Sequence, residues 1–286
     1  MNEKKCIICG EFKAGSDEHI IPKSLGNETL RIDNVCKECN EGLGKYVDEH
    51  LVNNFLTQLI RHIMGLKGQS KTIPNPFKTG KDEDGNIIHV DEQYKPYLNP
   101  SVTEENGIIS ISARTQKEAI KIAEKKLKRM KFSKDEIENI ISNREKIPVQ
   151  GYIPTVTYPV ETNMRKLFLG VLKIAYEYTY YVFGDLFYND KIAKEIRSIL
   201  LDATKGIFNK EYNKMNFIQD DLKESLNKCD MKVHLLQFFK EDNELYLMIS
   251  LFLEPALSFC VCVSEDASKY NINNVEHLVI YIKNNK

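Results

Sequence analysis

The sequence of 286 residues lacks an apolar run long enough to cross a membrane. Its most apolar stretch, 245–263, is interrupted by Glu254 and Pro255, and the next, 167–187, contains three charged residues. Neither reaches the roughly 18 uninterrupted apolar residues that a spanning helix needs. The first residues also lack the apolar core of a signal peptide. These absences predict no membrane association and a cytoplasmic location, where thiols stay reduced.

The sequence also lacks an excess of positive or negative charge. The chain has 40 Lys and Arg against 41 Asp and Glu, a net charge of −1. This excludes a protein that binds nucleic acid through overall basicity, so any such contact must come from a local patch. The sequence also has no GxGxxG motif, no P-loop, no Ser/His/Asp arrangement, no internal repeat and no low-complexity tract.

Cysteines are present, and four of the seven form two C-x2-C pairs, Cys6/Cys9 and Cys36/Cys39, separated by 26 residues. Each pair places two thiolates about one tight turn apart, and two pairs supply the four soft ligands that Zn²⁺ accepts at a tetrahedral point. We therefore predict a structural zinc site. A redox C-x-x-C, which usually occurs singly, and buried free thiols are the alternative interpretations. Three cysteines show no ligand spacing, namely Cys229, Cys260 and Cys262.

The segment between the two pairs contains Glu18 followed by His19, two β-branched residues and Pro22. This order is typical of a short strand that ends in a turn. Asn40 directly follows the last cysteine of the second pair. Apolar residues then recur every four positions over 43–59, which predicts one helix after the second pair.

These features resemble the HNH endonuclease family, the zinc-knuckle branch of the ββα-metal nucleases. The resemblance covers about residues 5–60 and is carried by the cysteine pairs, the segment from Glu18 to Pro22, the Asp33-Asn34 pair and Asn40. It implies that His19 is the general base and that Asn34 orients it. It also implies that Glu18 and Asn40 bind a catalytic Mg²⁺ or Mn²⁺ ion.

Phosphodiester hydrolysis requires the groups that the resemblance implies. A hard divalent ion with oxygen ligands can neutralise charge on the phosphate and on the leaving oxygen. An imidazole with an unperturbed pKa of about 6.5 can accept the proton of the attacking water near neutral pH. We therefore expect two metals with different functions, a sulfur-bound structural Zn²⁺ and an oxygen-bound catalytic Mg²⁺ or Mn²⁺.

The most basic part of the sequence lies outside this segment. Residues 114–146 contain 11 Lys and Arg against 6 Asp and Glu, a net charge of +5, whereas residues 1–60 contain 7 against 10, a net charge of −3. We predict that a helix over 115–130 contacts the DNA backbone. The alternative is an ordinary solvated helix face. The predicted contacts are Lys117, Lys121, Lys125, Lys128 and Arg129.

The predicted fold class is α+β. We expect a small N-terminal zinc-knuckle ββα-metal module over 1–64, a linker over 65–77, and a larger α+β domain over 78–286 with long helices and a C-terminal antiparallel sheet. Within that domain the patterns predict a buried central helix over 161–183 and a second helix over 190–203. Strands are predicted over 233–239, 245–253, 258–263 and 277–282.

The leading hypothesis is a metal-dependent endonuclease that cleaves double-stranded DNA in restriction or anti-phage defence. Residues 78–286 would then govern target recognition, dimerisation, or the binding of an activating ligand or partner. Because one HNH site cuts one strand, we expect a homodimer. Two alternatives remain open at this point, a non-catalytic zinc-module protein that binds nucleic acid or senses a signal, and an RNase on the same scaffold.

Overall fold

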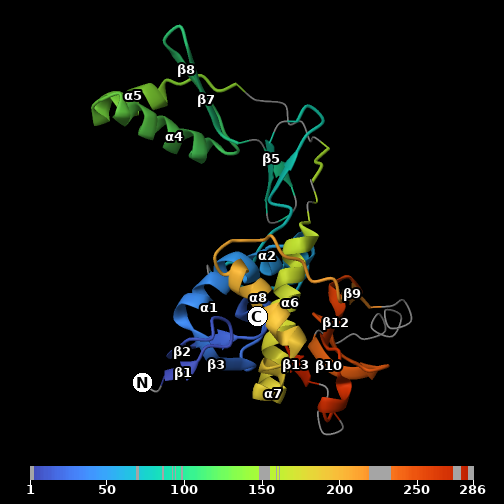
Figure 1. Cartoon of the computed structure of the whole chain (residues 1–286). Coiled ribbons are helices and arrows are strands. Elements are labelled where there is room, and N and C mark those ends of the chain that lie inside the picture. The colour runs from blue at the N-terminus through green and yellow to red at the C-terminus, as the bar shows by residue number, and fades with distance from the viewer. Residues whose placement is uncertain are drawn as a thin grey trace. The chain divides into compact units, whose positions relative to one another are not determined.

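A computed structural model describes residues 3–68, 71–85, 87–91, 93, 95–97, 99–147, 155–158, 160, 162–218, 233–272 and 278–282. Cys229 lies outside the described residues. The chain forms two compact units (Figure 1). Unit 1 comprises Met1–Asn75 together with Glu161–Lys286, and unit 2 comprises Pro76–Val160.

Unit 1 begins with a small antiparallel sheet of strands β1 (Glu3–Lys5), β2 (Phe12–His19) and β3 (Arg31–Cys36), in that order across the sheet. Four helical segments follow, namely α1 (Lys37–Leu43), a π-helical turn (Gly44–Asp48), α2 (Glu49–Val52) and α3 (Phe55–Ile63). The helical stretch predicted over 43–59 is therefore present, but it is not a single helix, because the chain leaves the helical conformation at 53–54. Asn54 takes an extended conformation and its side chain caps α3 by accepting the Leu56 N–H at 3.0 Å. Apolar residues recur every four positions on both sides of this break, so the sequence pattern does not reveal it.

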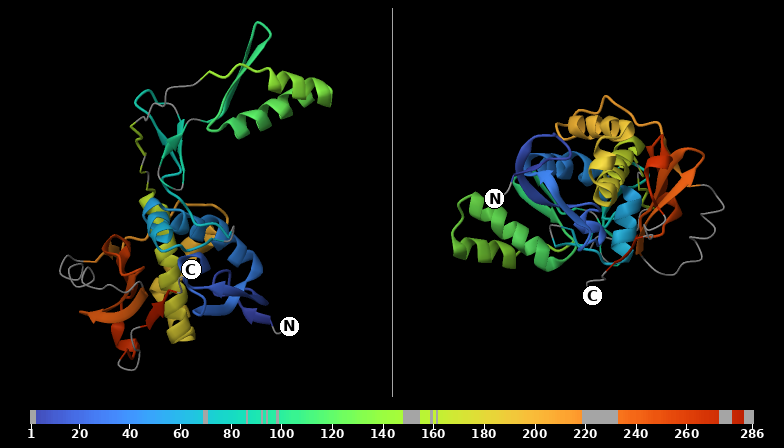
Figure 2. Two further views of the ribbon diagram at one scale, coloured as in Figure 1. Left: turned by 180° about the vertical axis from the view of Figure 1, so that it is seen from behind. Right: turned by 60° about the horizontal axis from the view of Figure 1, so that its bottom comes forward.

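Helix α6 (Met164–Phe183) crosses the interior of unit 1. Asn163 caps its first turn by accepting the Lys166 N–H at 3.1 Å, and Gly184, with φ +55°, ends it. Its side chains are buried almost continuously over 167–179, which confirms the predicted buried central helix. Figures 1 and 2 show α6 between the blue N-terminal segment and the orange and red C-terminal strands. Neither α6 nor any other helix in the described part of the chain has the length and apolarity needed to cross a bilayer.

A second antiparallel sheet forms the C-terminal part of unit 1. Its strand order is β13-β10-β11-β12-β9 within the described residues, which confirms the predicted C-terminal antiparallel sheet. The strands are β9 (Met215–Phe217), β10 (Val233–Glu241), β11 (Glu244–Ser250), β12 (Ser258–Ser264) and β13 (Leu278–Tyr281). Helices α7 (Asp185–Tyr188) and α8 (Lys191–Ala203) precede it.

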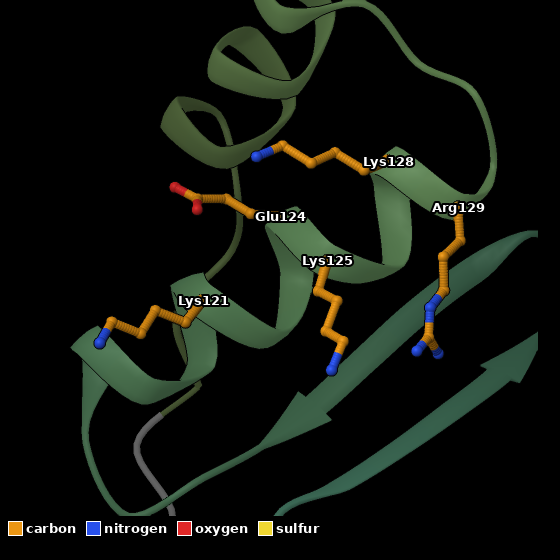
Figure 3. A pocket seen from close by; sticks show the side chains of 5 residues that line it. All are labelled: Lys121, Glu124, Lys125, Lys128 and Arg129. Atoms are coloured by element: carbon orange, nitrogen blue, oxygen red, sulfur yellow. The ribbon is translucent and has the colours of Figure 1, made fainter.

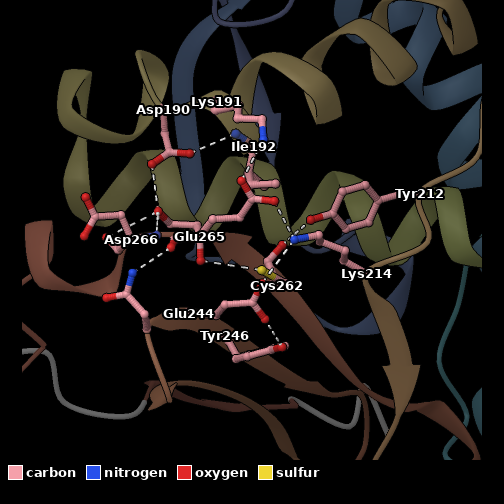
Figure 4. Close-up of polar contacts among 12 residues, drawn as sticks. Asp190, Lys191, Ile192, Tyr212, Lys214, Glu244, Tyr246, Cys262, Glu265 and Asp266 are labelled. Carbon is pink, nitrogen blue, oxygen red and sulfur yellow. Dashed lines mark hydrogen bonds and ion pairs between the residues drawn. The ribbon is translucent and has the colours of Figure 1, made fainter.

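Polar contacts attach α8 to this sheet (Figure 4). Asp190 caps α8 through the Ile192 N–H at 2.8 Å, and its other oxygen accepts hydrogen bonds from Ser264 at 2.7 Å and Tyr270 at 2.9 Å. Lys214 forms ion pairs with two carboxylates, those of Glu244 at 3.1 Å and Glu265 at 2.6 Å. The N-terminus of α8 is thereby fixed to the end of β12.

His234 on β10 attaches the same sheet to the N-terminal segment. Its Nδ1 accepts the Phe252 N–H at 3.2 Å, so in the neutral ring Nε2 donates to the Leu25 carbonyl at 3.0 Å. Full burial lowers the pKa of His234 to about 4, which keeps the ring neutral at physiological pH.

The structure groups the residues differently from the division expected at 65–77. Segment 161–286 packs with segment 1–75, because α6 lies directly on α2 and on the first cysteine loop. Tyr176 donates a hydrogen bond to the Ile7 carbonyl at 2.6 Å, and a Cβ on Gly170 would come within 2.6 Å of the Leu51 Cβ. The expected module and the C-terminal segment therefore share one hydrophobic core.

Unit 2 is an insertion between α3 and α6. It contains a small sheet of β4 (Thr79–Lys81), β5 (Ile87–Val90) and β6 (Pro96–Tyr97), and a hairpin of β7 (Ser101–Glu105) and β8 (Ile108–Ser112). Helices α4 (Gln116–Arg129) and α5 (Lys134–Ser142) follow the hairpin. Thr115 caps α4, and Ser133 forms a capping box with Glu136 on α5. These signals explain why α4 matches its predicted range so closely.

The contact between α6 and α2 predicts the effect of one added methyl group. Gly170→Ala should lower the free energy of unfolding by about 1–2 kcal/mol, because overpacking at the Leu51 Cβ outweighs the gain in helix propensity. Gly44→Ala is the matched control, since Gly44 is helical and has open space around its Cβ position. Urea unfolding of both variants measures the difference, and equal stabilities would contradict the packing described.

Candidate metal centre and active site

The predicted zinc ligands come together in space. Their ligand atoms all lie within 4.8 Å of one another. Zinc–sulfur bonds of about 2.3 Å in a tetrahedron place sulfur atoms about 3.8 Å apart, and the Sγ atoms of Cys9 and Cys36 are separated by 3.9 Å. The cluster, Cys6, Cys9, Cys36 and Cys39, can therefore hold a metal such as zinc.

Local structure explains why these four thiols converge. Cys6 follows β1, and Gly10, with φ +77°, closes a tight turn by donating its N–H to the Cys6 carbonyl at 2.9 Å. Cys36 ends β3 and Cys39 lies in the first turn of α1. The Cys36 N–H donates to the Cys6 sulfur at 3.4 Å. The hydrogen bond between Cys6 and Cys39 lowers the pKa of Cys6 to about 4 and raises the pKa of Cys39, so Cys6 is the thiolate of this pair and Cys39 keeps its proton until a metal replaces it.

His19 is the last residue of β2, and its ring is half-buried. Its Nε2 atom is buried and has no hydrogen-bond partner among the described residues. Burial lowers the pKa of His19, and the nearby Arg31 lowers it further. The imidazole is therefore neutral near pH 7 and has an unshared lone pair, which is what a general base needs.

Glu18 and His19 point to opposite faces of β2, since neighbouring side chains alternate along a strand. Across the sheet, Glu18 is paired with Ile32 and His19 with Arg31. Glu18 faces the interior and is 3% exposed. Its Oε1 forms an ion pair with the ammonium of Lys173, a residue of α6. The structure thus places the predicted metal ligand against a lysine that sequence reasoning did not identify.

Lys173 is the centre of a buried group of charges, here called the Lys173 cluster and consisting of Lys173, Glu18, Asp48 and Glu177. Its Nζ lies 3.2 Å from Asp48 Oδ2 and 3.5 Å from Glu177 Oε2, and it donates a hydrogen bond to the His19 carbonyl at 2.9 Å. Burial alone would lower the pKa of Lys173, but the carboxylates raise it well above its ordinary value. Burial raises the pKa of Glu177 far above its usual range.

The two predicted asparagines lie apart from this cluster. Asn40 donates from Nδ2 to Ser16 Oγ at 3.0 Å and to the Asp17 carbonyl at 3.4 Å, which fixes α1 on β2. Asn34 donates to the Tyr180 hydroxyl on α6 at 3.4 Å. No hydrogen bond joins His19 to either asparagine in the part of the chain that the structure describes.

The two predicted ligands of the catalytic ion differ in their contacts. Glu18 is engaged by Lys173, whereas Asn40 is held on β2 through its Nδ2, and no described hydrogen bond uses its Oδ1, the atom that could bind a cation. Hard divalent ions need several converging oxygen ligands, and Glu18 could supply one only by leaving Lys173. The four-sulfur cluster fits its metal, whereas the oxygen site requires Glu18 to change partners.

The predicted DNA-contact residues lie on α4 in unit 2. Four of the five line a shallow pocket of about 390 Å³ together with Glu124, and Lys117 does not line it. Figure 3 shows Lys125 and Arg129 extending to the same side of the helix. None of the five forms an ion pair with a carboxylate of the described residues. The apolar face of α4, which includes Ala123 and Leu127, instead lines a cavity of about 840 Å³ with β8 and α5.

The fold and the four-sulfur cluster define a module built from a β-hairpin and a helix that can hold a metal such as zinc. Residues 6–56 match the family model described as HNH endonuclease. The N-terminal module is therefore an HNH endonuclease domain, as the sequence resemblance predicted. No curated protein and no solved structure matches the chain.

Removal of one sulfur ligand tests the metal assignment. Cys39→Ser should abolish zinc binding and unfold the N-terminal module, because structural zinc supplies about 10–16 kcal/mol of apparent binding energy in small zinc peptides. Cys260→Ser is the control, since Cys260 lies half-buried on β12 outside the cluster. Metal content by mass spectrometry and circular dichroism report the outcome. A folded Cys39→Ser protein that retains one zinc ion would contradict the assignment.

Proposed function

We propose that the protein is an HNH-type endonuclease that hydrolyses phosphodiester bonds in double-stranded DNA, with His19 as the general base. One observation carries the proposal. Within a segment that matches the HNH endonuclease family, His19 has a neutral imidazole with an unpartnered Nε2. A zinc ribbon with a purely structural role does not need such a group.

The chemistry assigned to His19 follows from its surroundings. The neutral imidazole would accept a proton from water through the ring nitrogen that carries its lone pair, and the resulting hydroxide would attack the phosphorus while the 3′ oxygen leaves. The Lys173 contact to the His19 carbonyl fixes the backbone at this position, so the ring is held on the face opposite Glu18. A Mg²⁺ or Mn²⁺ ion bound through Glu18 and Asn40 remains part of the proposal, and it requires Glu18 to leave Lys173.

DNA binding is proposed for the basic face of α4. Lys121, Lys125, Lys128 and Arg129 gather around one shallow pocket without described acidic partners, so their charges are available to phosphates. We further propose a homodimer, a cytoplasmic location and a function in restriction or anti-phage defence, with residues 78–286 selecting the target or binding an activating ligand or partner.

A non-catalytic zinc-module protein is the second candidate. The observation that favours it is the ion pair between Glu18 and Lys173, which engages the carboxylate that catalysis would require. Nuclease activity that depends on His19 separates the two candidates.

The first functional prediction concerns this histidine. With plasmid DNA and Mg²⁺ or Mn²⁺, His19→Ala should cleave about 10²- to 10⁴-fold more slowly than the unmodified protein. Because burial lowers the pKa of His19, cleavage should fall on the acid side with an apparent pKa below about 6.5. His50→Gln is the matched control, since His50 in the same module packs on Phe208 and should retain activity. Equal cleavage by wild type and His19→Ala would refute the nuclease proposal.

The second functional prediction concerns DNA affinity. In a His19→Ala background, changing Lys121, Lys125 and Lys128 to Gln should weaken binding and reduce the salt slope by up to about 2.7, from about 0.9 per lost phosphate contact. The control removes the same charge from exposed lysines of unit 1, at Lys194, Lys205 and Lys240. Fluorescence anisotropy across a salt series compares the two. An equal loss in both triple variants would assign the effect to net charge alone.

A further inference from the structure

The polar contacts described for the Lys173 ammonium are all with oxygen atoms. Its neighbours are carboxylate oxygens of Glu18, Asp48 and Glu177 and the backbone carbonyl of His19. Lys173 is 0% exposed, so its charge is removed from bulk water. Carboxylates and carbonyls are also the ligands that hard metal cations prefer. The ammonium thus has the surroundings of a bound cation.

These surroundings contain more carboxyl groups than one ammonium can neutralise. Three carboxyl groups face one lysine, and burial raises the pKa of each of them, so the cluster holds protons as well as the ammonium. Asp48 Oδ1 and both carboxylate oxygens of Glu177 are buried and have no hydrogen-bond partner among the described residues. Buried polar atoms without partners are unfavourable. The cluster therefore has capacity for further positive charge.

Glu18 is the member of the cluster that a divalent ion could share. It lies next to His19 on β2, whereas Glu177 lies one turn from Lys173 on the same helix. If the ammonium releases Glu18, it still has Asp48 and Glu177 as partners. Exchange of one cation for another at Glu18 therefore leaves no buried charge unpaired, which is the condition that makes such an exchange feasible.

We propose that Lys173 and the catalytic divalent ion compete for Glu18, so that the ion binds only when the ammonium releases this carboxylate. Helix α6, which lies outside the segment matching the HNH family, thereby controls the loading of the active site. The proposal depends on the proposed function only for the role of the ion, because competition at Glu18 can be measured without cleavage.

The experiment is a Mn²⁺ titration of the full chain followed by electron paramagnetic resonance, which does not detect zinc. The informative variant combines Lys173→Met with Glu177→Gln, since it removes the ammonium together with the carboxyl group one turn away on α6. This double variant should bind Mn²⁺ about tenfold more tightly than the unmodified protein. Adding Glu18→Gln should abolish the gain. Circular dichroism and zinc content verify that each variant is folded.

Two results would overturn the proposal. The first is unchanged Mn²⁺ affinity in the double variant. The second is a gain that survives Glu18→Gln, because the ion then binds elsewhere.

If the variants do not fold, a measurement on the unmodified protein tests the proposal instead. Side-chain ¹⁵N resonances of lysine can be followed while Mg²⁺ is added. The buried Lys173 resonance should shift as Mg²⁺ saturates the site, and saturation without a shift would overturn the competition. Equal cleavage by wild type and His19→Ala would instead refute the nuclease proposal. The Mn²⁺ and Mg²⁺ binding measurements would still test the competition at Glu18.

Discussion

The interaction on which the rest of unit 1 depends is the burial of the Lys173 ammonium among oxygens of the N-terminal segment. Charges taken out of water are tolerated only when every partner is in place, so this contact fixes how α6 lies against β2 and α2. Apolar packing at Gly170 and the hydrogen bond from Tyr176 to Ile7 then extend the same interface towards the cysteine cluster. The HNH domain is consequently one side of a larger core rather than a separate module.

This arrangement places the four-sulfur cluster and the Lys173 cluster on one small sheet. The sulfur cluster joins the loop after β1 to the end of β3 and the start of α1, and so it fixes the strands from outside. The oxygen atoms lie on the inner face of β2, while His19 projects from the opposite face. Because α6 also packs against β11 and β12, a change in the C-terminal sheet can reach Glu18 through a single helix.

The parts that the sequence made predictable are those encoded over short distances. Spacing alone located the four cysteines of the sulfur cluster, and periodicity located α6, α8 and the C-terminal strands. The break at Asn54 was not predictable, because apolar residues kept their period through it. The partner of Glu18 was not predictable either, since Lys173 lies 155 positions away in the sequence. A signal was nevertheless present, because Lys173 and Glu177 stand four residues apart in an otherwise apolar helix, as a buried ion pair would require.

The central claim is that the β2–β3 hairpin and α6 form one cooperative structure around Lys173. Native-state hydrogen exchange of the full chain tests it most directly, because exchange under low denaturant gives the opening free energy of each amide. The account predicts that the protected amides of β2, β3 and α6 converge on one opening free energy and one dependence on denaturant. A hairpin that opens through its own transition at lower free energy, while α6 stays protected, would contradict it.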